Sequence, residues 1–196
     1  MSVLVALKDK NRIVVGVDTR MSCGQSFTDS YKQRPKAYHV DSKRTVIVGC
    51  VGNVGLLDIM KMIMENHMDD IDLIDRSYIV RYIIPELIVE IKTYNMEDKD
   101  YKMEGELFLA IKDRAFVIHG NYAVEGLENF AAIGSGMDSA NGSLFTSERF
   151  ITNAEDRVAI AIQTTGQNIS SVSSEAIIGD TAGKLFTPYS RSLKRK

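Results

Sequence analysis

The sequence is poor in the residues that build metal sites and disulfide frameworks. Its 196 residues include two cysteines, three histidines and no tryptophan. Cys23 and Cys50 are too few for a disulfide framework, and the first residues carry no secretory signal, so we expect reduced thiols in a cytoplasmic protein. No spacing of cysteine and histidine matches a zinc site, so the sequence predicts neither a metal nor a cofactor.

Long apolar runs and an excess of one charge are also missing. No apolar run reaches the roughly 18 residues that a membrane-spanning helix needs, so we expect no membrane span. The 24 basic and 26 acidic side chains leave a net charge of -2. This balance offers no global positive field for nucleic acid or anionic lipid. The content of 44% hydrophobic and 26% charged residues predicts one globular domain over residues 1–196.

Short segments rich in β-branched and aliphatic residues open the chain. Residues 2–8 and 12–18 flank a polar turn and predict a β-hairpin. Residues 19–34 are polar and predict a loop before a second pair of strands. The further predicted strands lie at 36–40, 45–51, 106–112, 115–119, 130–133, 176–179 and 184–186.

Two pairs of helices interrupt these strands. Apolar residues recur at helical spacing in 54–67, where Asn53 could cap the first turn, and again in 77–94. Pro85 predicts a kink or break near Ile84. Further helices are predicted at 137–146 and 155–167. The order of strands, helices, strands, helices and strands fits an α+β fold, in which two antiparallel sheets stack between helix layers as an αββα sandwich.

The first strand pair carries a distinctive order of residues. Ser2 opens an apolar strand, and residues 13–17 lead into Asp18-Thr19-Arg20. This order resembles the opening of β subunits in the proteasome and HslV family of N-terminal-nucleophile hydrolases. In that family an N-terminal threonine is the nucleophile, and an aspartate ends the second strand within an Asp-Ser/Thr-Arg signature. The resemblance implies that Ser2 is the nucleophile and that Asp18 supports it.

Three later segments extend the resemblance, which covers the chain from Ser2 to about Phe186. The family's catalytic lysine begins the third strand, and Lys36 matches it if the preceding loop is longer by two residues, with Lys32 as the alternative. The strand-to-helix turn places Gly52 on the glycine whose N–H forms the oxyanion hole. The Gly-Ser-Gly segment places Ser135 on the serine that supports the N-terminal amine.

The chain departs from the family pattern at three points. Ser2 stands where threonine is usual and so lacks the methyl group that restricts the rotamer. The family also has an aspartate three residues before a serine, and Gln167 and Ser170 fall on these positions. Glutamine forms hydrogen bonds but carries no charge, so it supports a protonated amine less well. Met1 precedes the nucleophile and has to be removed before Ser2 has a free amine.

The residues suit nucleophilic catalysis by the N-terminal residue. The free amine of Ser2, with a pKa of about 8, can act as the base for the hydroxyl of the same residue. A buried Lys36 beside Asp18 would lower the pKa of both groups. The same two residues could equally be an ordinary buried ion pair without a catalytic role.

The resemblance implies a peptidase that cleaves peptides or unfolded proteins within a homo-oligomeric ring or stacked assembly. It allows an ATP-dependent unfoldase as a partner. Two other functions remain open, namely a non-catalytic scaffold or assembly subunit and a small-molecule amidase on the same fold. The positions expected near the substrate are Arg20, Met21, Arg34, Cys50 and Val54.

Overall fold

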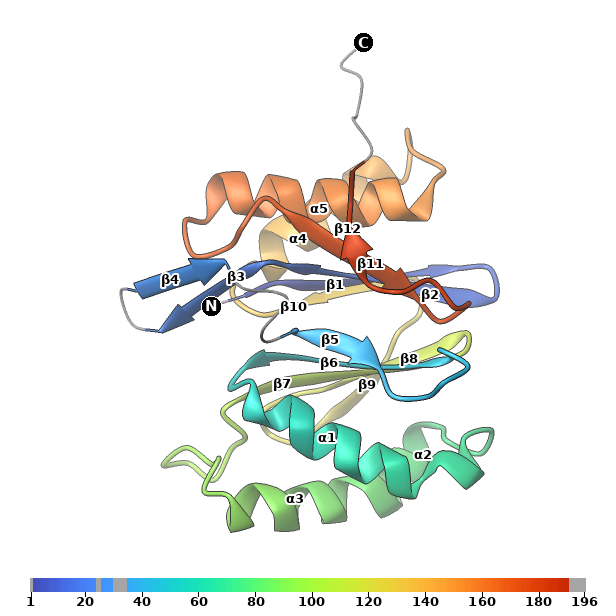
Figure 1. Cartoon of the computed structure of the whole chain (residues 1–196), viewed down its shortest axis with the longest axis vertical. Coiled ribbons are helices and arrows are strands. Elements are labelled where there is room, and N and C mark those ends of the chain that lie inside the picture. Colours follow the sequence, from blue (N-terminus) through green and yellow to red (C-terminus); the bar gives the residue numbers. More distant parts are fainter. Residues whose placement is uncertain (1, 24–25, 30–34, 191–196) are drawn as a thin grey trace.

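The computed structural model describes residues 2–23, 26–29 and 35–190. In this part of the chain, two five-stranded antiparallel sheets stack face to face with helices on both outer faces (Figure 1). The predicted α+β sandwich is therefore confirmed. None of the described helices is both long and apolar enough to cross a membrane.

The first sheet is built around the predicted N-terminal hairpin. Leu4 pairs with Val17 and Asp9 with Arg12, so the hairpin closes at a turn in which Lys10 adopts a φ of 56°. The strands, in spatial order, are β10 (Phe130–Ile133), β1 (Leu4–Asp9), β2 (Arg12–Asp18), β11 (Ala176–Asp180) and β12 (Thr187–Pro188).

The second sheet is buried on both faces. Leu107 and Leu109 of its central strand pack toward the helices, whereas Phe108 packs toward the first sheet, as the two-residue period of a strand requires. The strands, in spatial order, are β5 (Ala37–His39), β6 (Val46–Gly52), β7 (Gly105–Ile111), β8 (Arg114–Ile118) and β9 (Val124–Gly126).

Each sheet has its own helix layer (Figure 1). Helices α4 (Met137–Ser147) and α5 (Ala154–Asn168) cover the first sheet. The second sheet is covered by α1 (Gly55–Asn66), the 3-10 turn η1 (Met68–Asp70), α2 (Arg76–Tyr78), the π-helix η2 (Ile79–Ile83) and α3 (Ile84–Thr93). The apolar core consequently has three layers, one between the sheets and one under each group of helices.

The prediction of a loop at 19–34 was wrong in part. A short antiparallel pair, β3 (Arg20–Cys23) and β4 (Ser26–Asp29), lies in this segment. Each strand is only four residues long, which is the shortest length at which alternation of polar and apolar residues marks a strand, and within the described residues the two pair with each other rather than with either large sheet. The last strand was also misplaced, because 187–188 rather than 184–186 pairs with β11.

Two predicted features of the helices were nearly correct. The helix breaks where Pro85 predicts, since the π-helical turn 79–83 precedes α3 and Pro85 lies in the first turn of α3. Helix α1 begins at Gly55, and Val54 rather than Asn53 is its N-cap residue. The Asn53 side chain still accepts the N–H of Gly55 at 3.0 Å.

Candidate active site

Asp18 ends β2 as a fully buried carboxylate close to the start of β1. Its side chain has 0% of its surface exposed. One oxygen accepts the N–H of Val3 at 2.9 Å, next to Ser2 in the chain. The other accepts the N–H of Arg20 and the N–H of Ser173, both at 3.1 Å. These donors satisfy a buried charge and tie the first residues of the chain to β3 and to the segment before β11.

Lys36 lies directly before β5 and supplies the positive charge that Asp18 requires. Only 2% of the lysine surface is exposed, and its ammonium donates to Asp18 Oδ1 and to the carbonyl of Arg20, both at 2.5 Å. The carbonyl of Lys36 accepts the N–H of Cys50 at 2.9 Å, which fixes the lysine backbone against β6. The structure therefore brings Asp18 and Lys36 together, and Asp18 bonds to Val3, the residue that follows Ser2.

The backbone of Ser2 packs against the turn that follows β10. The hydroxyl of Ser135 donates to the carbonyl of Ser2 at 3.4 Å. Gly134 has a φ of 92°, and a Cβ there would lie 2.4 Å from the same carbonyl oxygen. A side chain at position 134 would thus displace Ser2. The Ser135 hydroxyl therefore contacts the carbonyl of Ser2, whereas the sequence led us to expect the amine.

Gly52 is placed at the end of β6, on the other side of this turn. It has a φ of 96° and an exposed backbone. The neighbouring residue Val51 lies close to the turn, since a Cβ on Gly134 would be 3.1 Å from Val51 Cγ1. The turn at Gly134 therefore has Ser2 on one side and the end of β6 on the other.

The predicted site residues Gln167 and Ser170 lie at the end of α5 and just after it. Gln167 lies exposed in the last turn of α5, and Ser170 lies exposed after it. The carbonyl of Ser170 accepts the Arg20 guanidinium at 2.6 Å, so Arg20 holds this segment in place. Sequence reasoning missed Ser173, whose N–H reaches Asp18. Nothing in the sequence marks it, because the contact is made by backbone.

Among the expected substrate contacts, Val54 lines a cavity. The cavity has a volume of about 550 Å³. The hydroxyl of Tyr38 in its wall donates to the carbonyl of Leu57 at 3.1 Å. Burial and the nearby Asp58 carboxylate raise the pKa of Tyr38. The lining residues are Pro35, Tyr38, Asn53, Val54, Gly55, Leu57 and Asp58.

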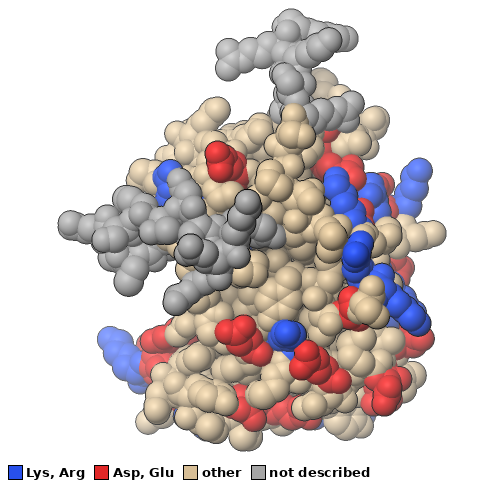
Figure 2. All heavy atoms as spheres, viewed as in Figure 1, with Lys and Arg blue, Asp and Glu red and all other residues tan. Residues whose placement is uncertain are grey.

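The remaining expected contacts have different surroundings. Cys50 is buried between β6 and α1, and desolvation raises the pKa of its thiol to about 12. Met21 is half-buried in β3. Arg34, the alternative lysine Lys32 and Met1 lie outside the described residues. Figure 2 shows acidic side chains gathered over the α1 layer, where Asp58 and Glu65 are exposed.

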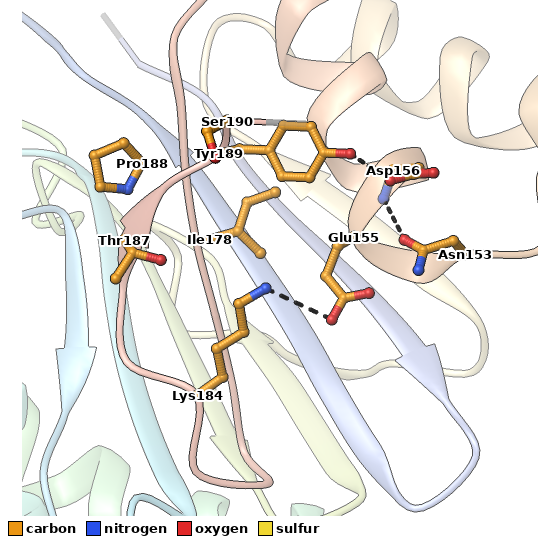
Figure 3. A pocket seen from close by; sticks show the side chains of 9 residues that line it. All are labelled: Asn153, Glu155, Asp156, Ile178, Lys184, Thr187, Pro188, Tyr189 and Ser190. Atoms are coloured by element: carbon orange, nitrogen blue, oxygen red, sulfur yellow. Dashed lines mark hydrogen bonds and ion pairs between the residues drawn. The ribbon is translucent and has the colours of Figure 1, made fainter. Parts of the chain in front are cut away.

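A second cavity lies between the start of α5 and the β11–β12 pair. It has a volume of about 360 Å³ (Figure 3). Its polar groups are paired with one another, since the Tyr189 hydroxyl bonds to Asp156 and Lys184 lies 3.6 Å from Glu155. We therefore do not assign it to the site around Ser2. In the described part of the chain, no group of three or more His, Cys, Asp or Glu side chains could hold a metal ion.

The fold is shared with solved structures of proteasome-like subunits. BPH of Thiobacillus denitrificans, solved with epoxomicin, superposes with a TM-score of 0.73 at 16% identity and covers 95% of this chain and 100% of its own. HslV of Trypanosoma brucei gives 0.68 at 16% identity, over 91% and 98%. Anbu, an ancestral β-subunit from Yersinia bercovieri, gives 0.70 at 13%, over 97% and 88%.

Sequence comparison adds no relative to these. No protein-family model matches the chain, and no curated protein matches it significantly. At 13–16% identity the structural matches establish the fold. The chain therefore has the same sandwich fold as BPH, HslV and Anbu, which is the fold that the resemblance at its first residues implied.

Proposed function

We propose that this chain is a proteasome-like peptidase that acts through the hydroxyl of Ser2 after Met1 is removed. The observation that carries the proposal is the buried Asp18–Lys36 pair, which bonds to the N–H of Val3 directly after Ser2. A buried ion pair is weak evidence of stability, because desolvation offsets much of its attraction. A catalytic role for the lysine charge gives a reason for the pair to lie next to the chain start.

The proposed reaction proceeds through an acyl-enzyme. The Ser2 amine takes the hydroxyl proton while the oxygen attacks the peptide carbonyl, and Lys36 favours the ionised hydroxyl. The N–H of Gly52 stabilises the oxyanion. The C–N bond then breaks, and the leaving amine takes the proton from the Ser2 amine. Water, deprotonated by the same amine, attacks the ester, and the amine returns this proton to the Ser2 oxygen as the second product leaves.

We assign the remaining predicted residues to positioning and binding. Ser135 holds the Ser2 backbone, and Arg20 holds the segment that contains Ser170. The cavity beside Val54 receives a substrate side chain, with Cys50 behind its wall. Its position supports this role, because β5 and the end of β6 border both the cavity and the Asp18–Lys36 pair.

We further propose a cytoplasmic homo-oligomer in which one domain of this kind forms each subunit. A peptidase that accepts unfolded chains without specificity needs an enclosed chamber, and a closed ring provides one. An ATP-dependent unfoldase would supply extended chains to such a chamber. A monomeric form with activity on small amides would instead favour the amidase function.

A scaffold or assembly subunit without activity is the second candidate. It is favoured by Gln167, which carries no charge where the family has an aspartate and lies exposed at the end of α5. A scaffold of this kind would retain Met1 or keep Ser2 unreactive.

Intact mass and epoxomicin labelling separate these candidates. We expect purified protein to lack Met1 and to gain one epoxomicin adduct, located on the peptide that begins at Ser2. Ser2→Ala should abolish the adduct. Ser77→Ala, which removes an exposed serine in α2, should leave it unchanged. Retention of Met1, or equal labelling of wild type and Ser2→Ala, would reject Ser2 as the nucleophile.

A further inference from the structure

Glu106 lies between the end of β6 and the Gly134 turn that packs against Ser2. It occupies β7, opposite Val51 and next to the pair formed by Gly52 and Gly105. One of its carboxylate oxygens accepts the N–H of Gly134 at 3.2 Å. The side chain of Glu106 thus joins the sheet strand beside Gly52 to the turn that packs against the Ser2 carbonyl.

The second oxygen of Glu106 is held by a histidine. His119, directly after β8, places Nδ1 2.9 Å from Glu106 Oε1 and Nε2 3.1 Å from Glu125 Oε2. These two carboxylates, from β7 and β9, are the charged groups that act on the imidazole in the described part of the chain. A carboxylate only accepts hydrogen bonds, so both contacts are satisfied at once only when His119 carries two protons.

We propose that Glu106 is a positioning residue of the Ser2 site and that protonated His119 holds it against the Gly134 turn. We call this arrangement of His119, Glu106 and the Gly134 N–H the lock. The geometry is a continuous chain of contacts from Glu125 through His119 and Glu106 to the N–H of Gly134. Its effect on catalysis rests on the proposed function of Ser2, whereas its effect on the turn does not.

The lock responds to pH in a defined direction. Burial lowers the pKa of His119, but hydrogen bonds to Glu106 and Glu125 outweigh this and raise it above the ordinary value of 6.5. A raised pKa in the folded protein means that the stabilisation is complete below 6.5 and is lost as pH rises through the folded pKa. Neutral His119 has one N–H and can hold only one of the two carboxylates.

This dependence is opposite in sign to that of the nucleophile. The amine of Ser2 must lose a proton to act as a base, so its contribution to the rate rises with pH. The lock weakens as pH rises through the raised pKa of His119. The structure therefore predicts a bell-shaped pH profile of kcat, whose alkaline limb belongs to His119.

Hydrogen–deuterium exchange of residues 130–136 tests the lock without relying on activity. We expect Glu106→Ala to accelerate exchange in this segment by about tenfold, which corresponds to the loss of one hydrogen bond to a charged group. In wild type, exchange corrected for its intrinsic pH dependence should increase from pH 6 to pH 9. His119→Gln should remove this increase, and Glu128→Gln, a matched loss of an exposed carboxylate that contacts no histidine, should leave it intact.

Glu106→Gln provides rescue in a variant that retains the shape of the side chain. Its amide oxygen can accept the Gly134 N–H while its NH2 group donates to neutral His119, so we expect corrected exchange at pH 9 to be as slow as that of wild type at pH 6. The value of kcat should fall about tenfold in Glu106→Ala and return at high pH in Glu106→Gln.

The outcomes separate this inference from the function proposed for Ser2. If wild type is active and Glu106→Ala changes neither kcat nor exchange of 130–136, the lock is wrong and the function of Ser2 stands. The lock is also wrong if His119→Gln keeps the pH response of wild type. If no variant has activity but exchange follows the pattern above, the lock is supported and the catalytic role of Ser2 fails.

Discussion

The buried pair of Asp18 and Lys36 gives the sharpest prediction about stability. Lys36→Met leaves a carboxylate with 0% exposure without its cation. Removing one partner of a buried ion pair costs about 3–5 kcal/mol of unfolding free energy. Three backbone N–H groups still bond to Asp18, so we expect a loss at the lower end, about 3 kcal/mol.

The double variant distinguishes a buried charge from a general packing defect. Asp18→Asn alone removes the negative charge that neutralises the buried Lys36 ammonium, so this variant should also be destabilised. Combined with Lys36→Met it removes both charges, so the double variant should be more stable than the sum of the single losses predicts, by about 2 kcal/mol. Urea unfolding at a fixed protein concentration measures each free energy.

An exposed lysine serves as the control. Lys61 is 46% exposed and lies 3.8 Å from Glu65, so Lys61→Met should change the unfolding free energy by less than about 1 kcal/mol. The reasoning is refuted if Lys36→Met costs no more than Lys61→Met, or if the double variant loses the full sum of the single effects. Epoxomicin labelling should be lost in both single variants and in the double variant. Lys36→Met and the double variant lack the lysine charge, and Asp18→Asn removes the carboxylate that holds the lysine in place.

Three further predictions concern other parts of the site. Gly134→Ala should cost more stability than Gly183→Ala, since both glycines have positive φ but only a Cβ at 134 meets a neighbour, Ser2 O at 2.4 Å; urea unfolding measures this difference. Only Gly134→Ala should slow epoxomicin labelling. The Cys50 thiol, with its pKa raised to about 12, should resist iodoacetamide at pH 8 in native protein and react in urea, as peptide mass spectrometry would show; fast native alkylation would contradict its burial. Asp58→Asn should lower kcat/KM for peptides with lysine before the scissile bond by about two- to fivefold relative to leucine, and an equal effect on both peptides would remove Asp58 from the cavity's selectivity.

Much of the architecture could be predicted from local patterns. The hairpin at 2–18 and the strand 45–51 are runs of β-branched and aliphatic residues bounded by polar turns, and the helix that became α1 repeats apolar residues every three or four positions. The β3–β4 pair was missed because each of its strands is only four residues long and the two pair with each other rather than with either large sheet. Local spacing therefore predicted the layers of the sandwich and missed its short, polar pair.

The candidate site divides in the same way. The sequence singled out Ser2, Asp18, Lys36, Gly52 and Ser135 through its resemblance to the proteasome and HslV family, because each falls on a position of that family's motifs. Only the tertiary structure decided which groups surround them. Ser173 reaches Asp18 across 155 residues and Glu106 reaches Gly134 across 28. Such contacts depend on how strands pair and layers stack, and no spacing along the chain encodes them.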